Sequence, residues 1–479
     1  MSDAAYQSPL GTRYASPAMQ HLWGEKHRVE LWRRLWLALM ETERELGLDI
    51  PAAAIEELSR HLDDIDLEAA AKYERRFRHD VMAHVHALGD LAPRARPFLH
   101  LGATSAYVTD NADLLVMREG LRLILGQLVA LLRALAVLAD KHAALPCLAY
   151  THFQPAQLTT VGKRATLWAQ DFGLDVEELC HRLDRFRLLG CKGTTGTQAS
   201  FLELFQGDHE KVRELDRRIA ARFDGSAPFA VSGQTYPRKA DSAVLDILSG
   251  IAQSAAKMAA DLRLLQHEGE LLEPFESEQI GSSAMAYKRN PMRAERITSL
   301  ARFVCSLPQN AAQTASAQWL ERTLDDSANR RLVLPEAFLA TDAVLILAIN
   351  IIAGLEVREA AIARHVAVQM PFMATEKWLM LGVAAGGDRQ ALHEVIRTAS
   401  LAAADRVSAG ESNDLVDRLS GHAAFSRVPR AAFTAELEPA AYTGRAARQV
   451  GEFLREYLEP LLAGAARHAA ATVSEEVRV

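Results

Sequence analysis

Cysteine is scarce in this chain of 479 residues, which has only four. They lie far apart and form no CxxC pair, which excludes a disulfide framework and a paired-cysteine zinc site: Cys147, Cys180, Cys191 and Cys305. An excess of basic residues is also missing, since the net charge is −7, and this argues against a nucleic-acid binder. The first residues lack the basic-then-apolar pattern of a signal peptide. We therefore expect a cytoplasmic protein with no nucleic-acid partner.

Long uninterrupted apolar runs are absent as well. The most apolar segment, Phe338–Leu355, contains Asp342 and Asn350, so it favours a buried bundle helix over a membrane span, and we expect no membrane partner. We find no β-rich region, no repeat of 20–50 residues and no low-complexity tract. The sequence therefore predicts an all-α fold.

Long helical patterns fill the centre of the chain. Leucines recur at steps of three and four residues until Pro146 ends the run: Leu114, Leu121, Leu125, Leu128, Leu132, Leu135 and Leu138. Three more long segments follow, and Pro308 and Pro335 are expected to mark kinks or early stops: Val161–Leu189, Ala240–Leu272 and Asn329–Leu355. Apolar residues cover more than one face of these helices, which predicts a bundle that is covered on both sides by other copies of the chain.

The same pattern divides the chain into three predicted domains. Residues 1–104 mix short helices with loops, residues 105–357 form the long-helix bundle, and residues 358–479 return to shorter amphipathic helices. The division predicts a helical domain on either side of a central bundle.

The segment Gly281–Glu295 carries the strongest chemical signal. Two hydroxyls follow a glycine, Lys288 comes six residues after Ser282, and Asn290-Pro291 is expected to cap and open a helix. Because a helix N-terminus attracts anions, the segment predicts a site that holds an anion against a serine hydroxyl. A plain Gly/Ser turn with a surface lysine is the alternative.

A family resemblance favours the first interpretation. The pattern G-S-x-x-M-x-x-K-x-N, from Gly281 to Asn290, resembles the signature of the fumarase/aspartase superfamily of β-eliminating lyases. The segments F-R-H-D-V-M-A-H and R-T-L-D-D-S-A-N-R-R resemble its vertebrate-type adenylosuccinate lyase branch. Ala286 stands where the family usually has proline. The resemblance implies a three-domain fold whose central bundle is the core of a homotetramer, active sites shared between subunits, and no cofactor.

The resemblance also implies the catalytic pair. Thr151–Ala156 is similar to the family segment T-H-x-Q-x-A, which implies that His152 is the general acid, although a lone loop histidine usually has no such role. Pro155 is expected to open a helix there. Ser282 corresponds to the general base. The implied reaction is β-elimination of fumarate from adenylosuccinate to give AMP, and from the succinyl-carboxamide ribotide of purine synthesis to give the carboxamide ribotide.

The substrate contacts follow from the same resemblance. Thr104 and Ser105 correspond to contacts of a substrate carboxylate, and Gln234 to a contact of the succinyl part. The remaining residues correspond to nucleotide, phosphate or charge-stabilising contacts: Arg13, Tyr14, Arg78, His79, Asp80, Lys288, Asn290, Arg296, Arg322, Ser327 and Arg331. Arginine suits phosphate because its planar fork donates two parallel hydrogen bonds. Taken alone, these arginines could equally form surface ion pairs with Asp325 and Asp326.

Three other hypotheses stay open at this point. Histidines 79, 84 and 86 suggest a metal site, but they lack HExxH spacing and a completing shell, so we expect no metal. Another lyase of the superfamily, such as argininosuccinate lyase, handles no phosphate. A structural or binding protein with a dead site is the third, and the presence of both Ser282 and His152 argues against it.

Overall fold

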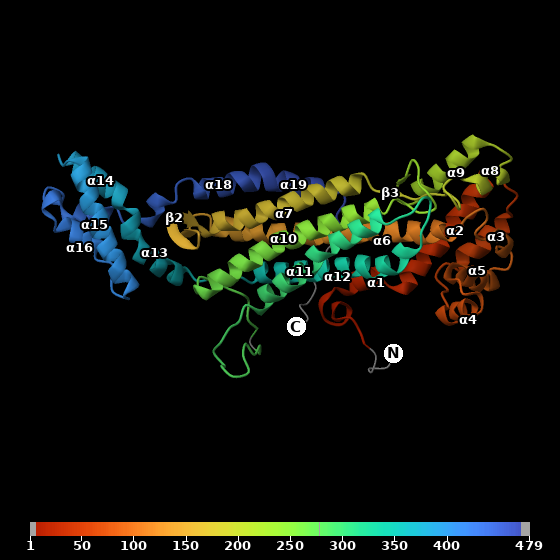
Figure 1. Ribbon diagram of the computed structural model, residues 1–479, viewed down its shortest axis with the longest axis horizontal. Helices are drawn as coiled ribbons and strands as arrows, with labels where there is room; N and C mark the ends of the chain where they lie inside the picture. The colour runs from red at the N-terminus through yellow and green to blue at the C-terminus, as the bar shows by residue number, and fades with distance from the viewer. Residues whose placement is uncertain (1–5, 277, 471–479) are drawn as a thin grey trace.

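A bundle of long helices forms the centre of the molecule (Figure 1). The computed structural model describes residues 6–276 and 278–470. Five helices make up the bundle: α6 (Ser105–Lys141), α7 (Val161–Asp184), α10 (Lys239–His267), α11 (Met292–Ser316) and α12 (Asp325–Ala353). The prediction of an all-α fold is confirmed, since the described residues add only six short strands.

The bundle helices run alternately in opposite directions between two ends. At the end that we call the pocket end, α6, α10 and α12 begin next to the N-terminal helices (Figure 1). These are η1 (Leu10–Tyr14), α1 (Pro17–Leu22), α2 (Glu25–Glu45), α3 (Ala52–Arg60), α4 (Leu67–Phe77), α5 (Asp80–Leu91) and η2 (Arg96–Phe98). Helices α8 (Ala199–Leu204) and α9 (His209–Ala221) lie at the same end (Figure 1).

The opposite end, which we call the hairpin end, carries a β-hairpin and a long loop. Strands β1 (Pro146–Thr151) and β2 (Gln154–Thr160) pair antiparallel after α6, and residues 268–291 connect α10 to α11. The C-terminal helices extend beyond this end, except α18 and α19, which run back along the bundle (Figure 1). They are α13 (Glu359–Met373), α14 (Thr375–Ala384), α15 (Arg389–Ser408), α16 (Leu415–Ser420), η3 (Ala423–Phe425), α17 (Arg430–Ala435), η4 (Pro439–Tyr442), α18 (Ala446–Phe453), η5 (Leu454–Leu458) and α19 (Glu459–Ala465).

The remaining strands are two-residue pairs that tie loops together. Strand β3 (Arg187–Leu188) pairs parallel with β4 (Ala227–Pro228), and β5 (Leu271–Leu272) pairs antiparallel with β6 (Glu356–Val357). The second pair joins the loop after α10 to the segment after α12, at the hairpin end.

One local prediction was wrong, and for two prolines the early-stop alternative is excluded, while the kink alternative stays a prediction. Pro155 opens no helix: it pairs with Tyr150 in the hairpin, and α7 begins six residues later, where the Thr160 hydroxyl accepts a hydrogen bond from the Lys163 N–H at 3.1 Å. A two-stranded hairpin has only edge strands, and these tolerate proline. Pro308 and Pro335 lie inside α11 and α12, so neither stops its helix early.

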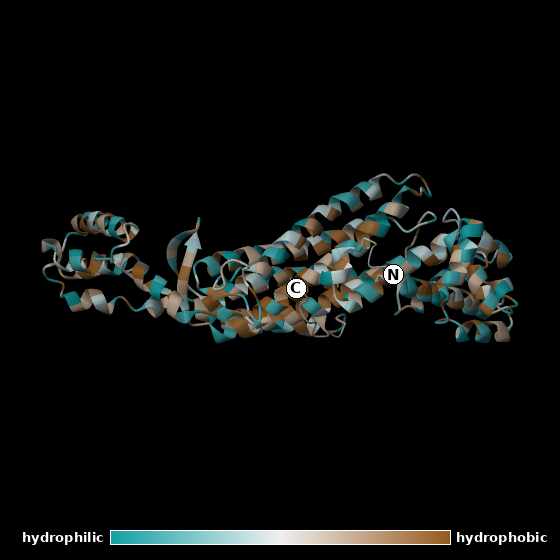
Figure 2. Ribbon diagram, turned by 90° about the horizontal axis from the view of Figure 1, so that it is seen from below, coloured by the Kyte–Doolittle hydropathy of each residue, from teal (hydrophilic) through white to brown (hydrophobic). Residues whose placement is uncertain are grey.

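The main hydrophobic core runs the length of the bundle (Figure 2). Helices α6 and α12 are long and apolar enough to cross a membrane by length and composition alone. However, 61% and 72% of their most apolar windows are buried inside the molecule. Core helices of globular proteins meet the same two criteria, so the finding is weak evidence for a membrane span.

Candidate active site

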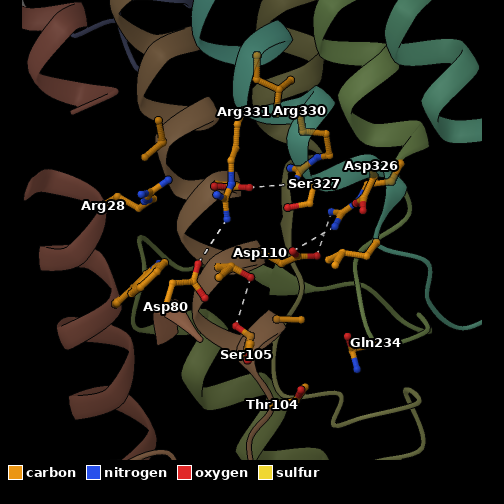
Figure 3. Close-up of a pocket in the computed structure, with 18 of the residues that line it drawn as sticks. Arg28, Asp80, Thr104, Ser105, Asp110, Gln234, Asp326, Ser327, Arg330 and Arg331 are labelled. Carbon is orange, nitrogen blue, oxygen red and sulfur yellow. Dashed lines mark hydrogen bonds and ion pairs between the residues drawn. The ribbon is translucent and has the colours of Figure 1, made fainter. Parts of the chain in front are cut away.

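A cavity of about 740 Å³ lies at the pocket end of the bundle (Figure 3). Its walls come from the turn between α1 and α2, the turn between α4 and α5, and the starts of α6 and α12. Nine of the sixteen predicted site residues line it: Arg78, His79, Asp80, Thr104, Ser105, Gln234, Arg322, Ser327 and Arg331. The fold therefore brings together segments that lie more than 200 residues apart in the sequence.

The turn between α4 and α5 positions its side chains through backbone contacts. Arg78 ends α4 in the left-handed region, with φ of 55°. His79 caps α5, since its Nδ1 accepts a hydrogen bond from the Met82 N–H at 3.3 Å. In the neutral ring, Nε2 then carries the proton, and it donates a hydrogen bond to the Ser105 Oγ at 3.3 Å. Asp80 accepts from Arg331 at 3.4 Å across the cavity (Figure 3).

A buried ion network forms one wall of the cavity. Arg238 donates from Nη1 and Nη2 to Asp110 at 3.0 and 3.2 Å, and from Nε to Asp326 at 2.6 Å. The other oxygen of Asp326 accepts from Arg322 at 2.8 Å. Burial by itself raises the pKa of Asp326, but the two arginines outweigh it and hold that pKa below its usual range. Arg322 is therefore fixed by a carboxylate that is itself fixed.

A second set of buried ion pairs adjoins the first. Arg330 donates to Asp241 at 2.7 Å, forms an ion pair with Asp113 at 3.0 Å, and contacts the Tyr236 hydroxyl. Burial raises the pKa of Asp113, and the nearby Arg330 only partly offsets this. Four of these pocket residues were not predicted from the sequence: Asp110, Asp113, Arg238 and Arg330. The spacing of Asp110 and Asp113, which places both on one helix face, was the available signal.

The predicted general acid lies far from this cavity, at the hairpin end. His152 and Phe153 form the two-residue turn between β1 and β2, and both side chains are exposed. Their φ angles are 53° and 57°, a left-handed conformation that costs a non-glycine residue roughly 1–2 kcal/mol. Positive φ at both positions is what a two-residue type I′ hairpin turn requires, although Asn and Gly are the residues that usually occupy it.

The predicted general base lies at the same end, in the loop between α10 and α11. The Ser282 Oγ accepts hydrogen bonds from the Ala284 and Met285 N–H groups at 3.3 and 3.1 Å. A side chain at Gly281 would meet the Lys288 carbonyl oxygen at 2.1 Å, so the loop closes only with glycine there. Lys288 itself is exposed.

Two details of the predicted anion site at this loop were wrong. Asn290 does not cap α11, which begins at Met292, because its side-chain amide donates to the Gly281 carbonyl oxygen at 2.9 Å. The N-terminus of α11 is already occupied by Glu273, which accepts from the N–H groups of Arg293 and Ala294 at 3.1 and 2.6 Å. The helix start therefore binds a carboxylate of the chain itself.

Tyr14 and Arg296 form a third group, outside the cavity, and Arg13 precedes Tyr14 in η1. The Arg296 guanidinium lies 5.4 Å from the centre of the Tyr14 ring, which is a cation–π distance. Arg296 belongs to the first turns of α11, so the group lies toward the hairpin end. The cavity at the pocket end thus excludes seven of the predicted residues: Arg13, Tyr14, His152, Ser282, Lys288, Asn290 and Arg296.

The length of α6 separates the two sets of residues. Ser105 begins this helix, which has 37 residues and is therefore about 55 Å long at 1.5 Å per residue. The hairpin that carries His152 follows its other end, and its strands have six and seven residues, or roughly 20 Å. The hairpin is too short to bring His152 back to Ser105 within one chain.

The three histidines of the sequence 79–86 do not gather around a common point. His84 packs edge-on against Trp32 with ring centres 5.4 Å apart, and His86 lies against Phe77 at 4.8 Å. Among the described residues, one group has metal-ligand atoms within 4.8 Å of one another, and it is His21, His27 and Glu30. The expected absence of a metal stays a prediction.

Comparisons with known proteins agree with this architecture. Residues 21–305 match the family model described as lyase, and residues 371–453 match the model described as adenylosuccinate lyase C-terminus. A solved structure, the 3-carboxy-cis,cis-muconate lactonizing enzyme from Pseudomonas putida, has a TM-score of 0.79 over 96% of this chain and 99% of its own. At 23% identity, that likeness shows the fold alone.

Two curated relatives are much closer in sequence. The adenylosuccinate lyase of Saccharomyces cerevisiae is 48% identical over 94% of both chains. The adenylosuccinate lyase of Schizosaccharomyces pombe is 46% identical over 96% of both chains. Identity of this level over nearly the full length of each protein shows the family, so the chain belongs to the adenylosuccinate lyases of the fumarase/aspartase superfamily.

Proposed function

We propose that this enzyme eliminates fumarate from adenylosuccinate to give AMP, and from the succinyl-carboxamide ribotide to give the carboxamide ribotide, as a step of purine nucleotide synthesis. The observation that carries the proposal is the cavity that joins Arg322, Ser327 and Arg331 to Thr104 and Ser105. Arginines and hydroxyls there can hold a phosphate and a carboxylate at once. Fumarase-type substrates without phosphate need no such set.

The difficult step of the reaction is removal of a weakly acidic proton next to a carboxylate. The resulting carbanion delocalises into that carboxylate, so stabilisation of the extra charge is the largest catalytic contribution. Ser282 acts as the base. The two N–H groups that donate to its Oγ stabilise the alkoxide form, which a free hydroxyl does not reach near neutral pH.

His152 protonates the departing nitrogen of the purine. Imidazole suits this role because it titrates near neutral pH. The left-handed turn holds the ring at the tip of the hairpin, where it is exposed and free to enter a site on another chain. Lys288 and Arg296 supply positive charge to the developing dianion.

We infer a homotetramer whose active sites combine residues from different subunits. The distance argument supports this, since the cavity and the catalytic pair lie at opposite ends of one bundle. Exposed apolar side chains on bundle helices also support it: Val137 (70% exposed), Leu167 (49%), Leu174 (53%), Leu264 (44%) and Leu332 (66%). A bundle covered by other subunits buries such residues.

The test is a direct assay of fumarate release from adenylosuccinate and, in parallel, from argininosuccinate. We expect release from adenylosuccinate only. Release from argininosuccinate alone contradicts the proposed substrate, and release from neither supports a binding protein with a dead site.

We further propose a cytoplasmic location, and retention of activity in reducing buffer is the expected result, because all four cysteines are free.

A further inference from the structure

Two histidines and a glutamate lie together where α1 meets α2. The metal-ligand atoms of His21, His27 and Glu30 all lie within 4.8 Å of one another. The two imidazole rings have centres 5.4 Å apart, and Nδ1 of His27 lies 3.4 Å from Oε2 of Glu30. His21 is exposed and the other two side chains are half-buried, so an ion from solvent can reach all three. Two imidazoles and one carboxylate are a donor set that transition ions such as Zn²⁺ prefer.

The backbone of this segment brings the three side chains together. His21 lies in the last turn of α1, and the other two lie three residues apart near the start of α2, on one face of that helix. The turn between the helices is two residues long, and the Gly24 N–H donates to the His21 carbonyl oxygen at 3.0 Å. Trp23 in this turn packs against Phe338 of α12, with ring centres 5.2 Å apart. The turn is therefore fixed to the bundle, and the histidines stay close to each other.

The separation of His27 and Glu30 suits a tetrahedral shell. Zn²⁺ lies about 2.0–2.2 Å from its nitrogen and oxygen ligands, so two ligand atoms of one tetrahedron are about 3.4 Å apart. The pair already has this separation, which is longer than an ordinary hydrogen bond. The exposed ring of His21 can rotate to supply the third ligand atom.

His27 is also in the protonation state that a metal requires. Imidazole binds a metal ion in its neutral form. Burial is the main cause that lowers the pKa of His27, and its contact with Glu30 only partly offsets this. The neutral ring therefore predominates near pH 7, and an ion displaces little proton there.

We propose that His21, His27 and Glu30 bind one divalent transition ion, such as Zn²⁺, per chain. Three protein ligands leave the fourth position of the tetrahedron to water. Because the ligands come from two helices, the ion holds α1 against α2 and stabilises the folded chain. The proposed reaction does not use this ion, so the prediction that catalysis needs no metal is unaffected.

The test titrates the metal-free, untagged protein with Zn²⁺ by calorimetry. We expect one tightly bound Zn²⁺ per chain, and no displacement by Mg²⁺, which prefers oxygen ligands. Loss of a group that only supports a ligand lowers metal affinity about 10- to 100-fold, so His21→Gln and His27→Gln should each lower it by about 100-fold. Zn²⁺ should also raise the melting temperature of the unaltered protein, but not that of the two variants.

A second histidine–carboxylate pair provides the matched control. His61 and Asp64 have the same spacing in the sequence, and their atoms Nδ1 and Oδ2 are 2.8 Å apart. No third ligand atom lies within 4.8 Å of this pair among the described residues. His61→Gln should therefore keep the wild-type affinity for Zn²⁺. Glu30→Gln keeps the shape of the side chain and removes its charge, so it decides the proposal if a histidine variant does not fold.

Two results would overturn the proposed site. One is the absence of a tight Zn²⁺ in the unaltered protein. The other is a Zn²⁺ affinity that the changes at His21, His27 and Glu30 leave at the wild-type value, which would show adventitious binding by other histidines only. The titration needs no turnover, so neither result depends on the proposed function.

Discussion

The two ends of the bundle hold their functional residues in opposite ways. At the pocket end, Arg238 and Arg330 are buried, and carboxylates of α6, α10 and α12 bind them. At the hairpin end, His152 and Lys288 are exposed, and backbone geometry positions them. The comparison is consistent with the proposed division of labour, in which one end is a rigid binding wall and the other presents the predicted catalytic groups to a second chain. Changes at the pocket end should therefore alter stability or affinity, and changes at the hairpin end should alter turnover alone.

The largest expected effect is on turnover at the hairpin end. Ser282→Ala and His152→Gln should each lower kcat by roughly 10²–10⁴-fold, the usual contribution of a general acid or base. Both side chains lie at the surface of the chain, so the thermal midpoint should stay within about one degree of wild type. Saturating adenylosuccinate kinetics and a melting curve check both statements. Near wild-type kcat in either variant removes that residue from the mechanism.

The next effect is on stability at the pocket end. Arg238→Met leaves Asp110 without its ion pair and Asp326 with Arg322 alone, which should lower the free energy of unfolding by about 3–5 kcal/mol. Thermal or denaturant unfolding measures it. Lys288→Met at the hairpin end is the matched control and should unfold like wild type. Equal stability of the two variants would break the comparison between the ends.

A pH-dependent effect also belongs to the pocket end. Glu43 on α2 is fully buried, neither carboxyl oxygen has a partner among the described residues, and burial raises its pKa from 4.5 to about 9. The carboxyl is then neutral in the folded protein, while the unfolded chain ionises above pH 4.5. The free energy of unfolding therefore falls as pH rises from 4.5 to 9, by about 1.4 kcal/mol per pH unit.

Replacement of this carboxyl should remove that dependence. Relative to wild type, Glu43→Gln should gain about 3 kcal/mol of stability between pH 5 and pH 7. Melting curves of both proteins across this range are the measurement. Parallel curves for the two proteins would show that Glu43 is ionised in the fold.

The smallest effect separates two arginines of the same wall. Arg331 is 61% exposed and pairs with Asp80 at 3.4 Å, whereas Arg322 binds the buried Asp326. Arg322→Ala and Arg331→Ala should each weaken substrate binding by about 1.5–3 kcal/mol. The KM for adenylosuccinate should therefore rise about 10- to 100-fold. Only Arg322→Ala should also lower the melting temperature. An unchanged KM in both variants would reassign these arginines to structural ion pairs.

The sequence predicted the all-α fold and, through the signature motifs, nine of the residues that line the cavity. It failed where tertiary contacts decide local structure. Asn290 and Pro155 have strong helix-start propensity, but the Gly281 carbonyl oxygen and the paired strand β1 determine their conformations. Glu273 was missed because only the folded chain brings it to the start of α11, twenty residues away.

The shared active site is the central claim, and mixed oligomers test it most directly. Ser282→Ala inactivates the hairpin end, and Arg322→Ala/Arg331→Ala disables the pocket end. The two inactive proteins are unfolded and refolded together, mixed oligomers are confirmed by mass, and fumarate release is measured. If each site takes its two ends from different chains, equal amounts should restore about a quarter of the sites, since each end is native half the time. Confirmed mixed oligomers that stay as inactive as their parents would contradict the account.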